Sequence, residues 1–360
     1  MRILHILNHT NRLNGHVHAA VDLACAQAQL GHDVCIASGG GDFDPLLHKN
    51  NVATVMVDHQ RKPVNLLKSS FALRKHVHAW QPDIVHAHMM TSAVLAWPIC
   101  RLSGTPLVTT VHNEFEKSAI LMGLGNRVIA VSEAVRASML RRGIPSSKLC
   151  VVLNGTIGSV RSEGRSRTPV DLPSPSILFV GGLHPRKGLP DLFEAFRLAH
   201  EQHPEARLVI VGEGPFQTNY MEMVAKMECA SAVAFLGAKE DPFPWMAAAD
   251  IFVLPSHADP APLVLSEARE AGCAVIGSNV DGIPQLLEYG AAGILVPPHD
   301  PPALAAVLSE LLGEPARMQE WKDKSQVHLD RLTISRVAHE TLDIYGSALA
   351  AGSKNAAVAA

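Results

Sequence analysis

The segment that decides the fold is Ile251–Ala268, which reads IFVLPSHADPAPLVLSEA. It opens with four apolar residues, continues through a proline-rich loop, and ends in a stretch of helical spacing. We therefore expect a strand over Ile251–Leu254 and a helix that begins near Leu263. Asp259 in the loop and Glu267 one turn into the helix are eight residues apart, and a loop that leads into a helix can aim both carboxylates at one ligand. An Asp in a turn and a Glu on a helix surface are the alternative.

The same alternation of short apolar runs and longer amphipathic stretches recurs on both sides of this segment. In the first half of the chain we expect strands at Arg2–Leu7, Val34–Ala37, Thr54–Val57, Ile84–His88, Leu107–Val111, Val128–Val131 and Leu149–Leu153, with helices such as His18–Leu30 and Leu66–Trp80. In the second half we expect further strands at Ile177–Val180, Leu208–Val211, Ala234–Leu236, Ala274–Ile276 and Ile294–Val296. Alternating strands and helices predict α/β structure with parallel sheets covered on both faces.

The length of 360 residues predicts more than one hydrophobic core. Residues 156–176, TIGSVRSEGRSRTPVDLPSPS, are poor in apolar residues and predict an exposed linker. We therefore expect two Rossmann-like domains, residues 1–155 and 177–330, facing each other across a cleft that holds the ligands at the carboxyl ends of the strands. A helix over about 334–349 is expected to pack back on the first domain, and residues 351–360 to form a flexible tail.

Composition excludes several classes of protein. The formal net charge is -3, from 31 basic and 34 acidic residues, which gives no footprint for nucleic acid. Six cysteines without a CxxC pair suit reduced thiols in the core of a cytosolic protein. The start of the chain, MRILHIL, predicts a strand rather than a signal peptide, and no run of 18 apolar residues exists. We therefore expect a cytoplasmic protein.

Glycine turns follow several of the predicted strands. Val180–Leu189, VGGLHPRKGL, leads from a strand through two glycines to Arg186 and Lys187 in front of a helix. Glycines let a ligand approach the backbone, and Lys187 can meet phosphate charge. An ordinary turn with a solvated Arg–Lys pair remains the alternative. Gly15 and the Gly212–Pro215 turn occupy similar places, while the absence of a GxGxxG motif argues against a dinucleotide site.

Taken in order, these segments form a longer pattern. It comprises the glycine loop near residue 15, Pro82–His88 (PDIVHAH), Thr109–Asn113 (TTVHN), Ala130–Glu133 (AVSE), Val152–Gly155 (VLNG), Val180–Gly188, Val211–Pro215 (VGEGP), the acidic pair Asp259 and Glu267, and Asp281–Pro301. In this combination the chain resembles the family-4 retaining glycosyltransferases (glycosyl transferases group 1) of the GT-B fold. The resemblance covers residue 1 to about residue 346.

The resemblance implies an enzyme that moves a sugar from a nucleotide-sugar donor to a glycan or lipid-linked acceptor. It implies retention of the anomeric configuration, no metal and no other cofactor, and a place in cell-surface polysaccharide or glycolipid synthesis. Contact with the inner face of the membrane is an open expectation.

The resemblance also implies roles for particular residues. In the catalytic group, Asp259 contacts hydroxyls of the donor sugar, Lys187 neutralises the diphosphate, and His112 lies beside the reacting carbon. Glu267 is expected to bind the ribose hydroxyls. The donor-binding group as a whole is Gly15, Gly182, Arg186, Lys187, Gly212, Glu213, Leu263 and Glu267. The acceptor-side group is His86, His88 and Asn113.

Two residues depart from the family pattern. Gly182 stands where the family usually has an arginine that contacts the diphosphate, and Asp259 stands where it usually has glutamate. Losing one charge-assisted contact costs about 1.5–3 kcal/mol, so weaker donor binding or slower leaving-group departure is expected. A catalytically degenerate protein that binds a sugar nucleotide or a partner enzyme is therefore an alternative.

Other readings of the sequence remain open. His86-x-His88 on a strand puts two imidazoles on one face, as in a zinc hydrolase, or simply lines the cleft or packs at the sheet end. Asp42-x-Asp44 in a glycine-rich loop is interpreted as a turn. The helix Asn65–Trp80 mixes apolar and basic residues and suits either a membrane surface or a sheet-covering helix with a basic outer face. A sugar-nucleotide epimerase is a further alternative with a similar two-domain build. The acidic pair and the Val180–Gly188 segment argue against it.

Overall fold

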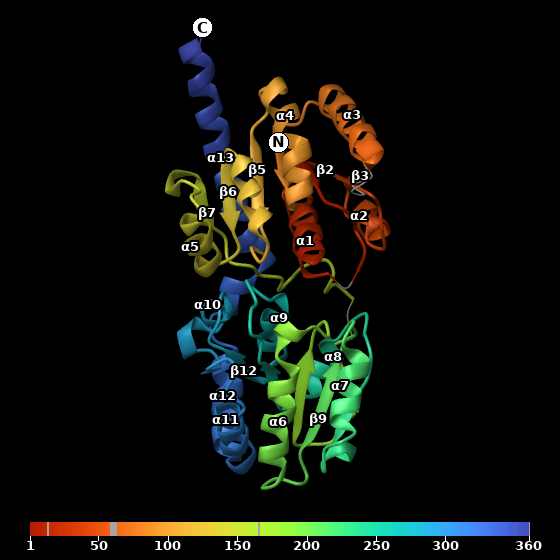
Figure 1. Cartoon of the computed structure of the whole chain (residues 1–360). Helices are drawn as coiled ribbons and strands as arrows, with labels where there is room; N and C mark the ends of the chain where they lie inside the picture. The colour runs from red at the N-terminus through yellow and green to blue at the C-terminus, as the bar shows by residue number, and fades with distance from the viewer. Residues whose placement is uncertain (13, 58–62, 165, 360) are drawn as a thin grey trace. The chain divides into compact units, whose positions relative to one another are not determined.

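The computed structural model describes residues 1–12, 14–57, 63–164 and 166–359, without the side chains of residues 63, 64, 66 and 352–359. The chain forms two compact units (Figure 1). One consists of Met1–Glu163 together with Leu332–Ala360, and the other of Gly164–Arg331. Each unit contains one parallel sheet with helices around it, which confirms the predicted α/β class.

The first unit has a seven-stranded parallel sheet in the order β3-β2-β1-β4-β5-β6-β7. The strands are β1 Arg2–Ile6, β2 Asp33–Ser38, β3 Val52–Met56, β4 Ile84–Ala87, β5 Leu107–Val111, β6 Arg127–Ala130 and β7 Leu149–Val151. Strand β3 begins two residues earlier than predicted. The turn before it closes at Asn51, which adopts a φ of 58° and lets the chain extend from Val52 onward.

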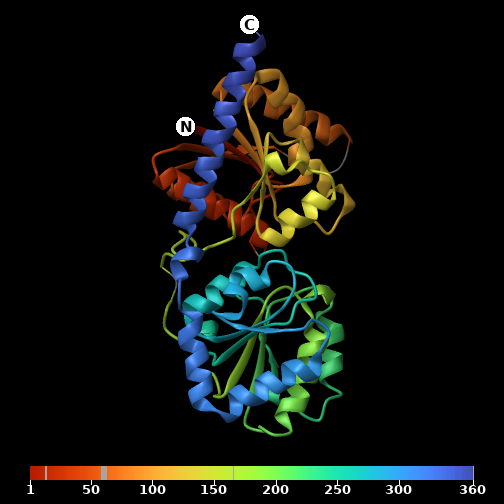
Figure 2. The ribbon, with the colours of Figure 1, turned by 90° about the vertical axis from the view of Figure 1, so that its left-hand side faces the viewer.

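Helices lie on both faces of this sheet (Figure 2). They are α1 Gly15–Gln29, α2 Asp44–Lys49, α3 Pro63–Trp80, α4 Met90–Ser103, α5 Glu133–Arg141 and α13 Ile334–Ala359, with the 3-10 segments η1 Lys117–Leu124 and η2 Ser146–Lys148. Helix α13 packs against α1 and buries Ala338, Tyr345 and Ala348 in the core of this unit. Residues 351–359 of the expected tail are the last turns of α13.

The expected exposed linker is wrong in its first part. Thr156, Ser159 and Val160 are buried in the first unit. Thr156 donates a 2.7 Å hydrogen bond to the buried carboxylate of Asp22 on α1, and Arg161 forms a 2.8 Å ion pair with it. A buried carboxylate is costly without partners, so Asp22 draws this segment onto α1. The sequence hides this because Asp22 lies far away along the chain.

The second unit has a six-stranded parallel sheet in the order β10-β9-β8-β11-β12-β13. Its strands are β8 Ser176–Val180, β9 Arg207–Val211, β10 Val233–Phe235, β11 Ile251–Leu254, β12 Ala274–Ser278 and β13 Ile294–Val296. Its helices are α6 Leu189–His200, α7 Gln217–Val224, α8 Phe243–Ala248, α9 Leu263–Ala271, α10 Ile283–Leu286, α11 Pro301–Gly313 and α12 Pro315–Ser325. Short 3-10 segments are η3 Pro185–Lys187, η4 Ala230–Ala232, η5 Glu288–Gly290 and η6 Leu329–Leu332. Helix α11 packs against α6.

Two expectations from composition can be compared with the structure. All six cysteines are free, and five of them are buried, as core thiols are. Among the described residues, no helix has the length and apolar character needed to cross a membrane.

Candidate active site

In the second unit, two loops at the carboxyl end of the sheet are pressed together. Gly188, which ends η3, has a φ of 68°, and a Cβ there would lie 1.9 Å from the carbonyl oxygen of Pro255. Only glycine allows this approach. The backbone N–H of His257 then donates a 2.7 Å hydrogen bond to the carbonyl of Arg186. The Arg186–Lys187 turn is thereby fixed against the loop that carries Asp259.

Lys187 and Asp259 form a buried ion pair. The Lys187 ammonium donates to Oδ2 of Asp259 at 2.5 Å, and the two residues are only 8% and 5% exposed. Ser256 donates a further 3.3 Å bond to the same oxygen, and Arg186 lies 3.9 Å from Oδ1. The structure thus brings together two residues of the predicted catalytic group and one of the donor-binding group.

The backbone around Asp259 is also held in place. Its N–H donates to Oδ2 of Asp281 at 2.7 Å, and its carbonyl accepts a 3.2 Å bond from Gly282 N–H. Burial raises the pKa of Asp281 above the usual value. Asp281 has a φ of 46°, a conformation that costs an ordinary residue energy. The loop is therefore built to keep Asp259 in one place.

Helix α9 begins at Leu263, as predicted, and places Glu267 one turn further on. Both residues are 8% exposed. A helix N-terminus offers free N–H groups and a positive dipole end to an anion. Glu213 of the predicted donor-binding group is exposed, and its carboxylate accepts a 3.3 Å bond from Ala238 N–H.

The glycines of the second unit differ in what they require. At Gly212 the φ is 139° and a Cβ would lie 1.9 Å from the carbonyl of Gly181, so no other residue fits. At Gly182 a Cβ would meet its nearest atom, Cδ2 of His184, at 3.4 Å, an ordinary contact. Lack of space therefore does not exclude a larger residue, such as the arginine expected from the resemblance, at position 182.

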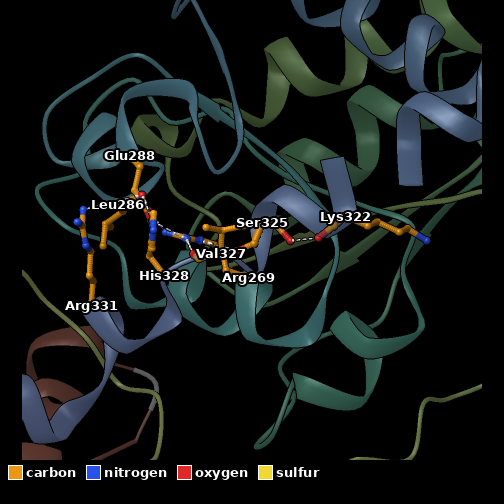
Figure 3. Close-up of polar contacts among 8 residues, drawn as sticks. All are labelled: Arg269, Leu286, Glu288, Lys322, Ser325, Val327, His328 and Arg331. Carbon is orange, nitrogen blue, oxygen red and sulfur yellow. Dashed lines mark hydrogen bonds and ion pairs between the residues drawn. The ribbon is translucent and has the colours of Figure 1, made fainter. Parts of the chain in front are cut away.

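Sequence reasoning missed the anchor of helix α9, which is Arg269 (Figure 3). This side chain is fully buried and donates to three backbone carbonyls: Ser325 at 2.8 Å, Leu286 at 2.6 Å and Val327 at 2.5 Å. It also donates to Glu288 at 3.0 Å. Arg269 lies two residues beyond Glu267, so this network fixes the helix that carries the predicted ribose contact. An arginine after an acidic residue gives no signal of burial in the sequence.

Glu288 also contacts two further side chains, those of His328 and Arg331. His328 contacts its Oε2 at 2.8 Å and Arg331 lies 3.9 Å from the same oxygen (Figure 3). Burial alone would raise the pKa of Glu288, but the hydrogen bonds from His328 and Arg269 hold it below the usual value. Glu288 is therefore charged at neutral pH and complements the buried guanidinium.

In the first unit, His112 follows the last residue of β5. Parallel pairing sets His5 of β1 beside His86 of β4, and His86 beside Val108 of β5. Side chains alternate along a strand, so Val108, Thr110 and His112 lie on the same face of the sheet as His5 and His86. His88 and His112 contact each other on this face, with Nδ1 of His88 3.1 Å from Nε2 of His112.

These imidazoles are neutral. Burial lowers the pKa of His112 to about 3 and that of His5 to about 4. Burial also holds the pKa values of His86 and His88 well below the usual value. Desolvation disfavours the charged ring, which explains the common direction of these shifts.

The structure gives His86 a different place from the predicted acceptor side. Its ring is fully buried, with Nδ1 2.6 Å from Oη of Tyr345 and Nε2 2.6 Å from Oγ1 of Thr110. Both nitrogens are therefore satisfied inside the core. His88 is 2% exposed and equally enclosed, whereas Asn113 is exposed beside His112. Gly15, the first residue of α1, is exposed and faces open space.

Two groups of side chains among the described residues have the spacing for a metal ion. The first is His5, His86 and His88, and the second is Asp191, His257 and His299. All six ring nitrogens of the first group already have protein partners. A metal there would have to break these bonds, which favours packing at the sheet end over the zinc-hydrolase reading. In the second group, His257 contacts Asp191 at 2.7 Å.

Comparison with known proteins identifies the two halves of the chain as glycosyltransferase domains. Residues 13–156 match the Glycosyltransferase Family 4 domain and residues 174–314 match the domain described as Glycosyl transferases group 1. Glycogen synthase of Mycobacterium tuberculosis is 28% identical over 381 residues, covering 92% of this chain and 90% of that protein. D-inositol 3-phosphate glycosyltransferase of Thermobispora bispora is 26% identical over 303 residues, covering 74% and 71%.

Solved structures share the fold. Anabaena HepE in complex with UDP and glucose aligns with a TM-score of 0.81 at 18% identity, covering 96% of this chain and 100% of that one. Sucrose-phosphate synthase from Thermosynechococcus elongatus aligns with a TM-score of 0.80 at 21% identity, covering 97% and 99%. These likenesses show that the chain has the GT-B fold. The two domain matches make it a glycosyltransferase of that fold. Within that class, the chain belongs to the family-4, group 1 glycosyltransferases.

Proposed function

We propose that this glycosyltransferase takes its sugar from a nucleotide-sugar donor and transfers it with retention of configuration, without a metal, to a glycan or lipid-linked acceptor. The observation that carries the proposal is the buried Lys187–Asp259 pair beside the N-terminus of α9, with Glu267 one turn into that helix. Cation, carboxylates and helix end together suit a sugar joined to a diphosphate.

Charge on the leaving diphosphate is the main demand of this reaction. The ammonium of Lys187 has three N–H donors, and Asp259 accepts one of them. Among the described residues no other side chain or carbonyl accepts from this ammonium, so the other two donors can bind phosphate oxygens. Arg186 and the free N–H groups at the start of α9 add to the positive field without a metal.

The remaining roles follow from the family resemblance. Glu267 holds the ribose hydroxyls, and Asp259 orients Lys187 and contacts the donor sugar. His112 lies beside the reacting carbon. The bond from the anomeric carbon to the diphosphate oxygen breaks while the acceptor oxygen bonds to that carbon from the same side, and the acceptor proton passes to the diphosphate.

The test is a turnover assay with UDP, GDP and ADP sugars and candidate hydroxyl acceptors. Release of nucleoside diphosphate is followed with and without EDTA, and NMR reports the anomeric configuration of the product. We expect one nucleotide series to turn over, unaffected by EDTA, with retention. Inversion or loss of activity with EDTA would contradict those parts of the proposal. Tight binding without any turnover would instead favour the degenerate alternative.

A second observation concerns the acceptor. On α3, Leu73 and Val77 are buried, whereas Leu67 and Phe71, one turn apart, are each 74% exposed. Lys68, Arg74 and Lys75 are exposed on the same helix, and Leu66 of the predicted apolar set lies outside the described side chains. Apolar residues flanked by cations suit an anionic lipid surface. We propose that this face of α3 docks on the membrane that carries a lipid-linked acceptor.

Vesicle flotation tests the docking face. Wild type is expected to float with vesicles that contain phosphatidylglycerol and to stay behind with phosphatidylcholine alone. The double variant Leu67→Ser/Phe71→Ser should lose flotation, whereas Leu30→Ser, at a 44% exposed position after α1, should keep it. Equal flotation of all three proteins would show that this face of α3 is not the membrane-binding surface.

A further inference from the structure

A continuous chain of hydrogen bonds crosses the buried face of the first unit and ends at His112. Its members lie on β1, α1, β4, β5 and α13 or directly after β4 and β5. They are, in order, Thr110, His86, Tyr345, Gln27, His5, His88 and His112. The six contacts in this order measure 2.6, 2.6, 3.4, 2.8, 2.9 and 3.1 Å. Apart from His112 and Thr110, every member is at most 2% exposed.

In such a chain, the donor-to-acceptor direction of one hydrogen bond determines the direction of its neighbours. A neutral imidazole carries one N–H and one lone pair, so a ring that donates at one nitrogen must accept at the other. Burial keeps the three rings His5, His88 and His112 neutral, as their lowered pKa values indicate. The direction of the first bond therefore sets the direction of all those that follow.

Gln27 on α1 provides the first bond. Its Oε1 lies 2.8 Å from Nε2 of His5, and an amide oxygen can only accept. His5 therefore carries its proton on Nε2 and accepts at Nδ1 from Nε2–H of His88, 2.9 Å away. His88 must then accept at Nδ1 from Nε2–H of His112.

The other arm of the chain is satisfied by the same assignment. The amide N–H₂ of Gln27 donates to Oη of Tyr345, whose hydroxyl donates to Nδ1 of His86. His86 then donates from Nε2 to Thr110. Each of the six bonds then has one donor and one acceptor. The alternative is reversal of the whole chain, which would put the proton of His112 on Nδ1.

We propose that His5 and His88 are positioning residues that hold His112 as the Nε2–H tautomer, so that its Nδ1 accepts a hydrogen bond from a hydroxyl of the donor sugar. This role rests on the proposed function. Within the described residues, Nδ1 of His112 has no hydrogen-bond partner. The neighbouring ring of His16, 6.0 Å from that of His112 between centroids, has a buried Nε2 that also lacks one. A buried nitrogen without a partner, as at Nε2 of His16, points to a polar group of a ligand beside the two rings.

The tautomer can be measured directly. Protein with ¹⁵N-labelled histidine is examined by NMR at pH 7.5 without donor, and the signals of His112 are assigned with His112→Gln. We expect a protonated Nε2 and an unprotonated Nδ1. A protonated Nδ1 in the wild type would overturn the proposal.

Two variants cut the chain upstream of His112. His5→Leu removes the link between Gln27 and His88, and Gln27→Met removes the group that sets the direction. Each is expected to give His112 a mixture of both tautomers and to lower kcat/KM for the donor about threefold to tenfold, the worth of one hydrogen bond. His48→Leu, at an exposed histidine bonded to Thr54, should leave the signals of His112 unchanged. A single unchanged tautomer in both chain variants would show that the chain does not set it.

The spectrum and the activity fail separately. A wild type with the Nε2–H tautomer but no sugar transfer would contradict the proposed function. It would not contradict the tautomer that we assign to His112. An active transferase whose His112 carries its proton on Nδ1 would overturn the positioning role of His5 and His88 without contradicting the proposed function.

Discussion

Gly182 stands where the family resemblance leads us to expect an arginine. The neighbouring residues Arg186 and Lys187 bring cations to the loop, but Lys187 already gives one N–H to Asp259. A Cβ at position 182 would find its nearest neighbour at 3.4 Å, and the backbone there is open to ordinary residues. The loop can therefore carry the missing guanidinium.

We predict that Gly182→Arg tightens donor binding. One added charge-assisted hydrogen bond is worth about 1.5–3 kcal/mol, so the Kd for a nucleoside diphosphate should fall at least about tenfold. Calorimetry at two salt concentrations measures this, and the gain should shrink at the higher one. Gly182→Gln is the uncharged control. An equal gain in that variant would show that charge is not the cause.

At this scale the sequence predicted the donor loops better than the histidines. Lys187 and Asp259 could be assigned to one site because each follows a strand of the same predicted sheet, and Leu263 could be placed by its helix start. Their ion pair was not predicted. Gln27 and Tyr345 could not, because their contact joins residues 318 apart. Such contacts depend on how whole helices pack, which no local pattern in this chain specifies.

At the scale of elements, α9 depends on one buried arginine. Helix α9 has no side-chain hydrogen bond at its N-cap, and Pro262 occupies that position. Its C-terminal half is instead tied down by Arg269, through four acceptors in three different segments. The N-terminal end of α9, where we propose that the donor binds, is thus fixed through contacts of the C-terminal half of the helix.

We predict that Arg269→Met destabilises the second unit by about 3 kcal/mol, because it leaves Glu288 and three carbonyls without their buried donor. Thermal melting measures the loss, and calorimetry should show weaker nucleotide binding because Glu267 moves with the helix. Arg197→Met, at a partly exposed arginine on α6 that pairs with Glu194 and Glu201, should melt close to the wild type. Similar melting of the two variants would contradict the anchoring role.

At the scale of the whole molecule, the two units should respond to acid at different pH. In the first unit the folded pKa values of His5 and His16 are lowered to about 4 and that of His112 to about 3, mainly by burial. The unfolded rings bind protons below about pH 6.5, whereas the folded rings do not until near pH 4. The unfolded state is therefore favoured as the pH falls through this window.

We predict that the first unit loses about 1.4 kcal/mol per pH unit for each such histidine between pH 6.5 and about 4. The lowered pKa of Glu288 stabilises the second unit at neutral pH, and this is lost only below its unfolded value near 4.5. Hydrogen exchange in urea at pH 7.5, 6.5 and 5.5 separates the units. Peptides of α1 should lose protection by pH 5.5, before those of α9. Equal loss in both would contradict the assignment.

The division of the chain itself was only partly predictable. The two parallel sheets follow from the alternation of strands and helices, and the strands Leu107–Val111 and Ile251–Leu254 form as expected. The boundary falls at Glu163 rather than 155, since the buried charge of Asp22 recruits residues 156–161. Composition alone cannot show that a polar segment has a buried partner.

The most direct test of the account is calorimetric titration of UDP, GDP and ADP into the wild type, Lys187→Met and the control Lys322→Met. Lys322 pairs with Asp250 elsewhere in the second unit. We predict that one nucleoside diphosphate binds the wild type and the control alike, while Lys187→Met binds it at least about tenfold more weakly, as loss of a charge-assisted contact requires. No binding to the wild type, or equal binding by all three proteins, would contradict a donor site built on Lys187.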